Sequence, residues 1–505
     1  MSSNIGDGNS NGDDSNVVGF PQTPEERRAL RKAKQDIEKR KLINVFIDEA
    51  GGDTALFRTP DGVSYADLIV NGHRETWPIR SRQFRAYYLK YLQRQLERLV
   101  NEESVLAMAM RAAIRKTAVN AAIDDFETRA SCVPTMREVF VRVAGHKDEL
   151  YIDLCNDAWE VVRVTAAGWS VVESPPVRFR RSDAMLSLPF PKRGGKIDAL
   201  RPFLNVMASD FVLIVAYVLQ ALYPRGPYPP LIPYGEQGTA KTTLLRRLRR
   251  LIDPHAVETA ALPPTGRDLF ISARNSHLLT FENLSRLSDQ MSDHICRLAT
   301  GGGYRIRKMF KDSDEVYFRG ARPIAFEGII NVVTKPDLQD RSIILELEFL
   351  PTYKTEAELD AEFERQRPGI FGALLDMMVR GLEMRPVTRL VSPPRMADFA
   401  TWSVACGLDQ FEAAYAANRQ NAINVMLSFD SVARAVRELM ATRKVWTGIT
   451  QELLAIVGPA TGIKAPRKLS DELRRLATPL RTVGIYISYE PRTATERRLR
   501  IERRK

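Results

Sequence analysis

The spacing of apolar residues changes along the chain and divides it into four segments. Residues 1–22 are mostly Ser, Asn, Gly and Asp, which predicts a disordered tail. Residues 23–192 mix helical spacing with short alternating runs, and the pattern changes near residue 193 and again near residue 425. We therefore expect a multidomain α/β protein with an α+β domain at 23–192, a second domain at 193–424 and a third at 425–505.

Residues 23–192 predict a hairpin, a helical stretch and several short strands. The hairpin joins 56–58 to 64–66 through a Pro-Asp-Gly turn, and helical spacing follows over 85–119. Strands are predicted at 139–143, 150–154 and 169–172. We find no metal-ligand spacing or nucleophile arrangement there, so the sequence does not indicate this domain's role.

The first motif with a chemical role in the second domain is a loop that contains glycines. An apolar run at 228–234 precedes the loop, and a helix-like segment at 244–252 follows it. Strand, loop, Lys-Thr and helix are the parts of a phosphate-binding loop, which predicts that ATP and Mg²⁺ bind here. Lys241 would reach the β and γ oxygens, and the Thr242 hydroxyl would hold Mg²⁺. The nucleotide-binding residues are Gly235, Glu236, Gln237, Gly238, Thr239, Ala240, Lys241, Thr242 and Thr243.

One position departs from the usual loop pattern, G-x-x-x-x-G-K-[ST]. Ala240 stands where the last glycine is expected. A methyl group is tolerated there if φ is negative, so the departure weakens the match to the pattern without breaking it. The alternative is that the segment is a chance Gly/Thr/Lys turn before a basic helix.

Two further strands end in acids. The apolar run 277–281 ends in Glu282 and Asn283, and we predict that Glu282 lies on the Mg²⁺ side as the acid of a Walker B strand. The position after it commonly carries a second acid, which orients or deprotonates the attacking water. Asn283 can position water but cannot take its proton.

The next strand, 322–326, ends in Glu327, where this class of ATPase usually has a polar sensor such as asparagine. The acid and the amide are thus exchanged between two strand ends. One hypothesis is that Glu327 supplies, wholly or partly, the base that Asn283 cannot. The other is that hydrolysis is slow and neither residue is a base.

Between these strands, residues 304–318 alternate around a polar turn, which predicts a hairpin. Its first strand and tip are basic and carry aromatic neighbours, which suits contact with a nucleic-acid strand. The alternative is ordinary solvated surface. The predicted DNA-binding residues are Arg305, Arg307, Lys308 and Lys311.

Two arginines follow the sensor strand. Arg341 is in position to reach a γ-phosphate on a neighbouring subunit, and the alternative is a structural Arg341–Asp pair at a helix end. Arg395 opens another helix and is a second candidate phosphate sensor.

The third domain predicts three helices, at 430–442, 449–457 and 469–483, followed by strands at 485–489 and 498–501. This order is typical of a winged helix, whose third helix and wing would contact DNA. The alternative is a small helical lid with an exposed basic tail.

Composition narrows the partners. Lys and Arg give the chain a formal charge of +12, which favours a polyanionic partner, nucleic acid or an anionic membrane surface. No apolar run is long enough to cross a bilayer, and residues 1–20 lack the apolar core of a secretory signal. The four cysteines are scattered without C-x-x-C spacing, so we expect a cytoplasmic protein without a zinc module or disulfide framework.

With these motifs placed, the stretch from Gly235 to Arg395 resembles AAA+ ATPases of the superfamily 3 helicase kind, the replicative helicases of viruses, phages and mobile elements. It is similar to the helicase half of poxvirus-type primase–helicases. The order of P-loop, Walker B strand, hairpin, sensor strand and arginine finger carries the resemblance. Ala240, Asn283 and Glu327 depart from the family's pattern.

The resemblance implies a hexameric ring with ATP sites between subunits and single-stranded or forked DNA in the channel. Residues 1–190 show no primase motif, so a separate primase or initiator would be a partner, and no membrane is implied. Two rivals are kept. One is an AAA+ initiator or remodeller that does not unwind DNA, and the other is a nucleotide-gated DNA-binding protein with little hydrolysis.

Overall fold

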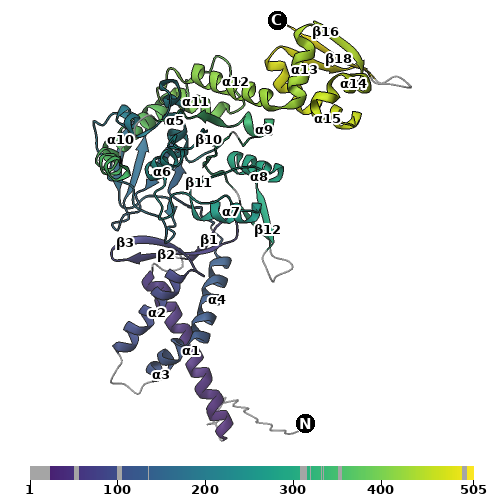
Figure 1. Ribbon diagram of the computed structural model, residues 1–505. Coiled ribbons are helices and arrows are strands. Elements are labelled where there is room, and N and C mark those ends of the chain that lie inside the picture. The colour runs from purple at the N-terminus through teal and green to yellow at the C-terminus, as the bar shows by residue number, and fades with distance from the viewer. Residues whose placement is uncertain are drawn as a thin grey trace, which may run out of the picture. The chain divides into compact units, whose positions relative to one another are not determined.

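The computed structural model describes residues 23–50, 56–98, 105–134, 136–307, 315–318, 320–330, 332–333, 335–350, 355–491 and 498–504 (Figure 1). The chain forms two compact units. The first lies within the residues up to Met136, and the second takes 137–505 together with the short segments 59–62 and 70–76. Helices occur with both parallel and antiparallel sheets, as expected for a multidomain α/β protein.

The first unit is mainly helical. Its helices are α1 (Pro24–Ala50), α2 (Arg82–Glu97), α3 (Val105–Ala113) and α4 (Lys116–Cys132). Phe46 of α1 packs its ring 5.0 Å from that of Tyr88 in α2 and 5.4 Å from that of Phe126 in α4. The predicted hairpin is confirmed, because β1 (Leu56–Arg58) pairs antiparallel with β2 (Ser64–Val70). Strand β3 (His73–Pro78) follows along the chain, and its residues up to Thr76 belong to the second unit.

A four-stranded antiparallel meander opens the second unit. Its strands are β5 (Val143–His146), β6 (Glu149–Asp153), β7 (Val161–Thr165) and β8 (Gly168–Val172), while β4 (Val139–Phe140) pairs separately with β9 (Arg178–Phe179). Side chains of the meander, such as Ile152 and Val164, share one buried cluster with α5 (Ala208–Ala221) and α10 (Glu356–Met384). A small sheet must bury its apolar face against another element. These strands therefore pack with the elements after residue 193, although the sequence analysis grouped them with the N-terminal domain.

A parallel sheet organises the middle of the second unit. Its strand order is β11 (Leu279–Phe281), β14 (Ile324–Phe326), β10 (Leu231–Tyr234) and β15 (Ile343–Glu346). Helices α5, α6 (Lys241–Ile252), α7 (Gly266–Asn275) and α8 (Asp289–Thr300) surround it (Figure 1). The carboxyl ends of parallel strands lie at one edge of a sheet, where α/β proteins place their ligands. That edge is where the predicted site residues begin.

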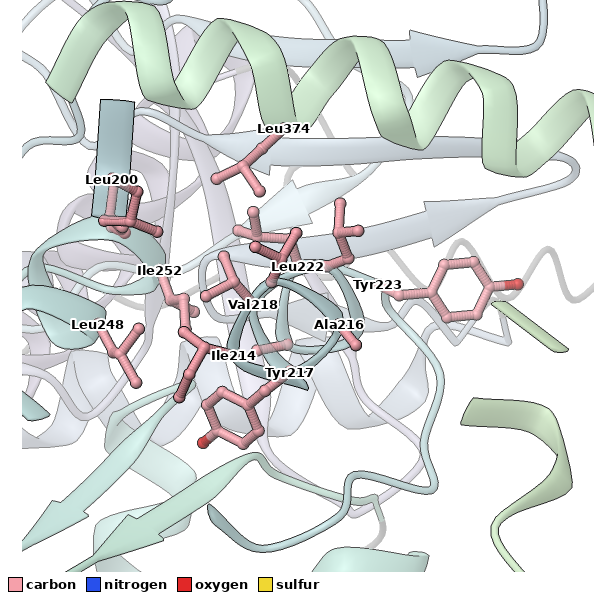
Figure 2. Close-up of a cluster of buried hydrophobic side chains, with 14 of the residues drawn as sticks. Leu200, Ile214, Ala216, Tyr217, Val218, Leu222, Tyr223, Leu248, Ile252 and Leu374 are labelled. Carbon is pink, nitrogen blue, oxygen red and sulfur yellow. The ribbon is translucent and has the colours of Figure 1, made fainter. Parts of the chain in front are cut away.

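The core beneath this sheet is centred on α5. Figure 2 shows Ile214, Val218 and Leu222 gathered near Leu248 and Ile252. All five side chains are at most 1% exposed, so α5 and α6 are fixed against each other by apolar packing. In the described part of the chain, no single helix has the length and apolar character of a membrane span; one bent pair, 197–203 with 208–221, meets those criteria together.

The C-terminal residues have a separate core. Helices α11 (Ala397–Ala405) and α12 (Phe411–Phe429) lead to α13 (Ser431–Ala441), α14 (Thr450–Thr461) and α15 (Pro466–Thr482). Strands β17 (Ile485–Tyr489) and β18 (Arg498–Arg503) follow, which confirms the predicted three helices and two strands. The sequence analysis missed β16 (Val445–Ile449), which pairs with β18 and completes a three-stranded sheet. A buried cluster including Trp446, Leu473 and Leu499 holds this sheet to the helices.

Candidate functional site

The loop from Gly235 to Ala240 connects β10 to α6 at the carboxyl edge of the parallel sheet. Gly235 has φ +153°, and a Cβ there would lie 2.6 Å from the carbonyl oxygen of Leu347. Only glycine fits this position, since the backbone of the segment after β15 passes so close. Glu236, Gln237 and Gly238 are exposed, so the apex of the loop faces solvent.

Ala240 is left-handed, with φ +58° and ψ 30°. The condition under which a methyl group is tolerated without strain, a negative φ, is therefore not met. The loop needs a left-handed residue to turn directly into α6, and the methyl group of alanine opposes that conformation. The sequence departure thus coincides with a strained backbone.

The Lys241 side chain is folded back onto the loop. Its Nζ donates to the carbonyl oxygens of Gly235 at 2.8 Å and Glu236 at 2.7 Å, and lies 3.3 Å from Thr239 Oγ1. The residue is only 8% exposed. A buried ammonium group facing backbone oxygens is a strong site for an anion that can replace them.

Asn205 ties the loop to the strand beside it. Its Nδ2 donates to the carbonyl oxygen of Thr239 at 3.0 Å and to that of Glu348 at 2.7 Å. Thr239 Oγ1 in turn donates to the Glu236 carbonyl oxygen at 3.0 Å. Asn205 was not predicted, because no sequence pattern distinguishes a single asparagine 30 residues before the loop.

Glu327 lies beside the start of α6. Its Oε1 accepts a hydrogen bond from the Thr242 hydroxyl at 3.0 Å and another from the backbone N–H of Asn283 at 3.2 Å. The residue is 2% exposed at the end of β14, the strand adjacent to β10. The structure therefore brings Thr242, Asn283 and Glu327 together.

Glu282 has another neighbour. Its Oε2 accepts a hydrogen bond from the Thr259 hydroxyl at 2.5 Å, and its N–H donates to the Ala260 carbonyl oxygen. Asn283 is exposed and left-handed, with φ +57°. The carboxylate bonded to Thr242 is thus that of Glu327, not that of Glu282.

The two arginines proposed as phosphate contacts share an acidic partner. Arg341 Nη2 lies 3.2 Å from Asp337 Oδ1, and Arg395 Nη2 lies 2.6 Å from the same oxygen. Arg395 also reaches Asp340 at 3.5 Å, and Arg419 pairs with Asp340. The ion pair of Arg341 with an aspartate at a helix end is present, as the structural alternative expected. The role of either arginine toward phosphate stays a prediction.

The hairpin is confirmed in its strands. β12 (Tyr304–Arg307) pairs antiparallel with β13 (Glu315–Phe318). The Tyr304 ring stacks on Phe270 at 4.3 Å, so this aromatic is engaged by the protein's own core. Arg305 is exposed, the Arg307 side chain is not described, and Lys308 and Lys311 lie outside the described residues.

Helix α15 has one apolar and one basic face. Leu469, Leu473 and Leu476 are buried on the first. The exposed basic residues of the helix are Arg467, Lys468, Arg474 and Arg481. Arg474 stacks 5.4 Å over the Tyr489 ring of β17.

Comparisons with known proteins identify two segments. Residues 197–428 match the family model of the actinomycete integrative conjugative element replication protein, and residues 432–505 match that of the AICE RepA C-terminal domain. No curated protein matches the chain.

Solved structures of the NrS-1 C-terminal region resemble the chain only loosely. An A-form apo structure has 11% identity and a TM-score of 0.34, covering 68% of this chain and 95% of that one. A second apo structure has 12% identity and the same TM-score, covering 68% and 93%. Residues 197–428 and 432–505 are therefore similar to actinomycete integrative conjugative element replication proteins. The two matches support a role in the replication of a mobile element.

Proposed function

We propose that this replication protein is an ATP-dependent, ring-forming DNA helicase that translocates on single-stranded DNA. In this proposal the parallel-sheet region is a AAA+ P-loop core, and residues 431–505 are a winged helix. ATP sites lie between subunits, most simply in a hexamer. The two family matches support the replication role, and the site geometry supports the motor.

The observation that carries the proposal is the grouping of Lys241, Thr242 and Glu327 at the carboxyl edge of the sheet. Lys241 already faces oxygen atoms inside the loop, which triphosphate oxygens would replace. The N-terminus of α6 directs its N–H groups and positive dipole end toward the same place.

The same residues fit a Mg²⁺ ion. The Thr242 hydroxyl and the Glu327 carboxylate at the end of β14 are hard oxygen donors, which Mg²⁺ prefers. Within the described ranges no group of three His, Cys, Asp or Glu side chains suits a metal, so nucleotide and water oxygens would complete its coordination. When bound, the ion neutralises charge that develops on the β and γ phosphates.

DNA contacts are proposed for two places. The exposed cations of α15 suit the phosphate backbone of duplex DNA, as does the third helix of a winged helix. The β12–β13 hairpin, which carries the exposed Arg305, would grip the single strand. A separate primase or initiator would supply priming.

Two observations favour a second candidate function, in which the protein binds ATP but hydrolyses it slowly. Asn283 replaces the usual second acid, and Ala240 strains the loop. A nucleotide-gated DNA-binding protein with little hydrolysis needs only the binding part of the site.

The test is ATP turnover and displacement of a strand from forked DNA, with and without single-stranded DNA. The native chain, Lys241→Ala and Glu327→Gln are compared, and mass measurement in solution gives the subunit number with ATP. DNA-stimulated turnover with strand displacement supports the helicase. Turnover without displacement supports an initiator, and nucleotide binding without turnover supports the gated binder.

A further inference from the structure

We infer that Glu327 is the carboxylate that holds the nucleotide-bound divalent cation together with Thr242, and that Glu282 does not contact the cation. This inference rests on the proposed ATP site. The order of motifs assigns the cation to Glu282 at the end of β11, whereas this inference assigns it to Glu327 at the end of β14.

The first support is the strand order. β14 lies directly beside β10, whereas β11 lies one strand further away. The end of β14 therefore faces the start of α6, and Glu327 Oε1 accepts a hydrogen bond from the Thr242 hydroxyl at 3.0 Å. In P-loop enzymes the loop Ser/Thr and one strand-end carboxylate hold the cation between them.

The second support is the environment of Glu327. The residue is 2% exposed, and its carboxylate accepts hydrogen bonds from two neutral groups, the Thr242 hydroxyl and the Asn283 N–H. Among the described residues, no Lys, Arg or His forms an ion pair with it. A buried carboxylate is costly unless a positive charge compensates it. A cation bound beside Thr242 would supply that charge.

The third support is that the carboxylate is held in place. The Glu327 N–H donates to the Phe281 carbonyl oxygen at 3.0 Å, and its own carbonyl oxygen accepts from Leu284 N–H at 2.9 Å. Asn283, between them, is left-handed, with its N–H on Glu327 Oε1. The unusual backbone at Asn283 thus fixes the side chain that faces Thr242.

Glu282 lacks these features. It is only partly buried, and its carboxylate accepts a hydrogen bond from the Thr259 hydroxyl at 2.5 Å. Thr259 belongs to the segment on the far side of β11 from β14, where Ala260 forms a parallel bridge to Phe281. The Glu282 side chain is therefore engaged away from Thr242.

The experiment measures binding of a fluorescent ADP with Mg²⁺ and with EDTA, and of Mn²⁺ to the protein–ADP complex by electron paramagnetic resonance. Glu327→Gln keeps the acceptor oxygen for Thr242 and Asn283 but removes the charge. We expect it to weaken Mn²⁺ binding about tenfold or more, and to abolish the gain in ADP affinity from Mg²⁺. ADP affinity in EDTA should stay near that of the native chain.

The matched control is Glu282→Gln, which should keep both Mn²⁺ binding and the Mg²⁺ gain. Equal melting temperatures establish that the variants fold; if Glu327→Gln does not, Glu327→Asp and Glu282→Asp are compared in the same way. If Glu282→Gln loses cation binding, or if both variants keep it, the inference is wrong but the ATP site stands. Failure of the native chain to bind ADP in either medium overturns the ATP site itself.

Discussion

The Lys241 ammonium group donates to the Gly235 carbonyl oxygen at 2.8 Å, so the loop is closed on its own lysine. Incoming phosphate oxygens would take over these hydrogen bonds, and the ammonium group would pair with a full negative charge. Binding therefore replaces neutral acceptors with charged ones, and the ammonium group gains a partner of opposite charge in a buried site.

Lys241→Ala should remove nucleotide binding. ATP at about 100 times its dissociation constant stabilises a binding protein by about 2.7 kcal/mol, and the variant should gain nothing. Thermal unfolding with and without Mg-ATP measures this difference. An exposed lysine on another helix, Lys90 in α2, provides the control: Lys90→Ala should keep the full gain. A gain that persists in Lys241→Ala would contradict the assignment of the loop.

Ala240→Gly should stabilise the protein. The left-handed conformation at φ +58° costs alanine about 1–2 kcal/mol, and glycine adopts it freely, so a net gain of about 1 kcal/mol is expected after the entropy of the unfolded chain is included. Ala413→Gly is the control, because Ala413 is exposed in the right-handed helix α12. That change should destabilise by about 0.5–1 kcal/mol. Denaturant unfolding compares the two, and shifts of equal sign would argue against strain at Ala240.

Asn205→Ala should weaken nucleotide binding although the side chain bonds only to backbone. Its amide holds the Thr239 and Glu348 carbonyl oxygens, and each lost hydrogen bond costs about 0.5–1.5 kcal/mol. Part of that cost should appear in ADP affinity, since Thr239 directly precedes Ala240 and Lys241. Asn421→Ala, at an exposed position of α12, should leave affinity unchanged. An equal effect of both variants would remove Asn205 from the site.

Arg341 is predicted to act on the ATP of a neighbouring subunit. Mixing Arg341→Ala subunits with Lys241→Ala subunits should restore part of the turnover, because some interfaces then combine an intact loop with an intact arginine. Turnover is measured across mixing ratios, with each variant alone as the reference. No recovery, together with a lower melting temperature for Arg341→Ala, would assign the residue to its ion pair with Asp337 instead.

His277 should make the protein sensitive to mild acid. Burial first, and then the charge of Arg322, lowers the pKa of His277 to about 4, and its Nε2 lies 2.6 Å from the Ala221 carbonyl oxygen. Because the folded pKa is below the unfolded value of about 6.5, folding excludes a proton. Stability is complete above pH 6.5 and falls as the pH drops toward 4, by about 3 kcal/mol.

Thermal unfolding from pH 7 to 4 tests this loss. His277→Gln keeps a donor for Ala221 and should flatten the decline over this range. His146→Gln, at an exposed position, should not. A decline that is unchanged in His277→Gln would place the acid sensitivity elsewhere.

The sequence predicted the elements that carry local signals. The glycines and Lys241-Thr242 marked the loop, alternation marked the β12–β13 hairpin, and apolar spacing marked the three C-terminal helices. Strand β16 was not predicted, because Val445–Ile449 is short and pairs with β18, about fifty residues later. Its partner is not visible in the local pattern.

The geometry around Thr242 was less predictable. Glu327 is 85 residues away in sequence, and their contact depends on β14 lying next to β10. Motif order alone ranked Glu282 first for the cation. The left-handed φ at Ala240 was not predictable either, because the loop pattern shows which residue departs from it but not the backbone conformation of that residue.

Asn418 of α12 adds a consequence for assembly. Its Oδ1 accepts the Ile344 N–H at 3.3 Å, and its Nδ2 donates to the Ile344 carbonyl oxygen at 2.7 Å. These are backbone groups on the outer side of β15, which ends the sheet. An unprotected edge strand invites pairing with a strand from another chain. The asparagine occupies the place that such a strand would take, so subunits that meet here must join through side chains and helices rather than by extending the sheet.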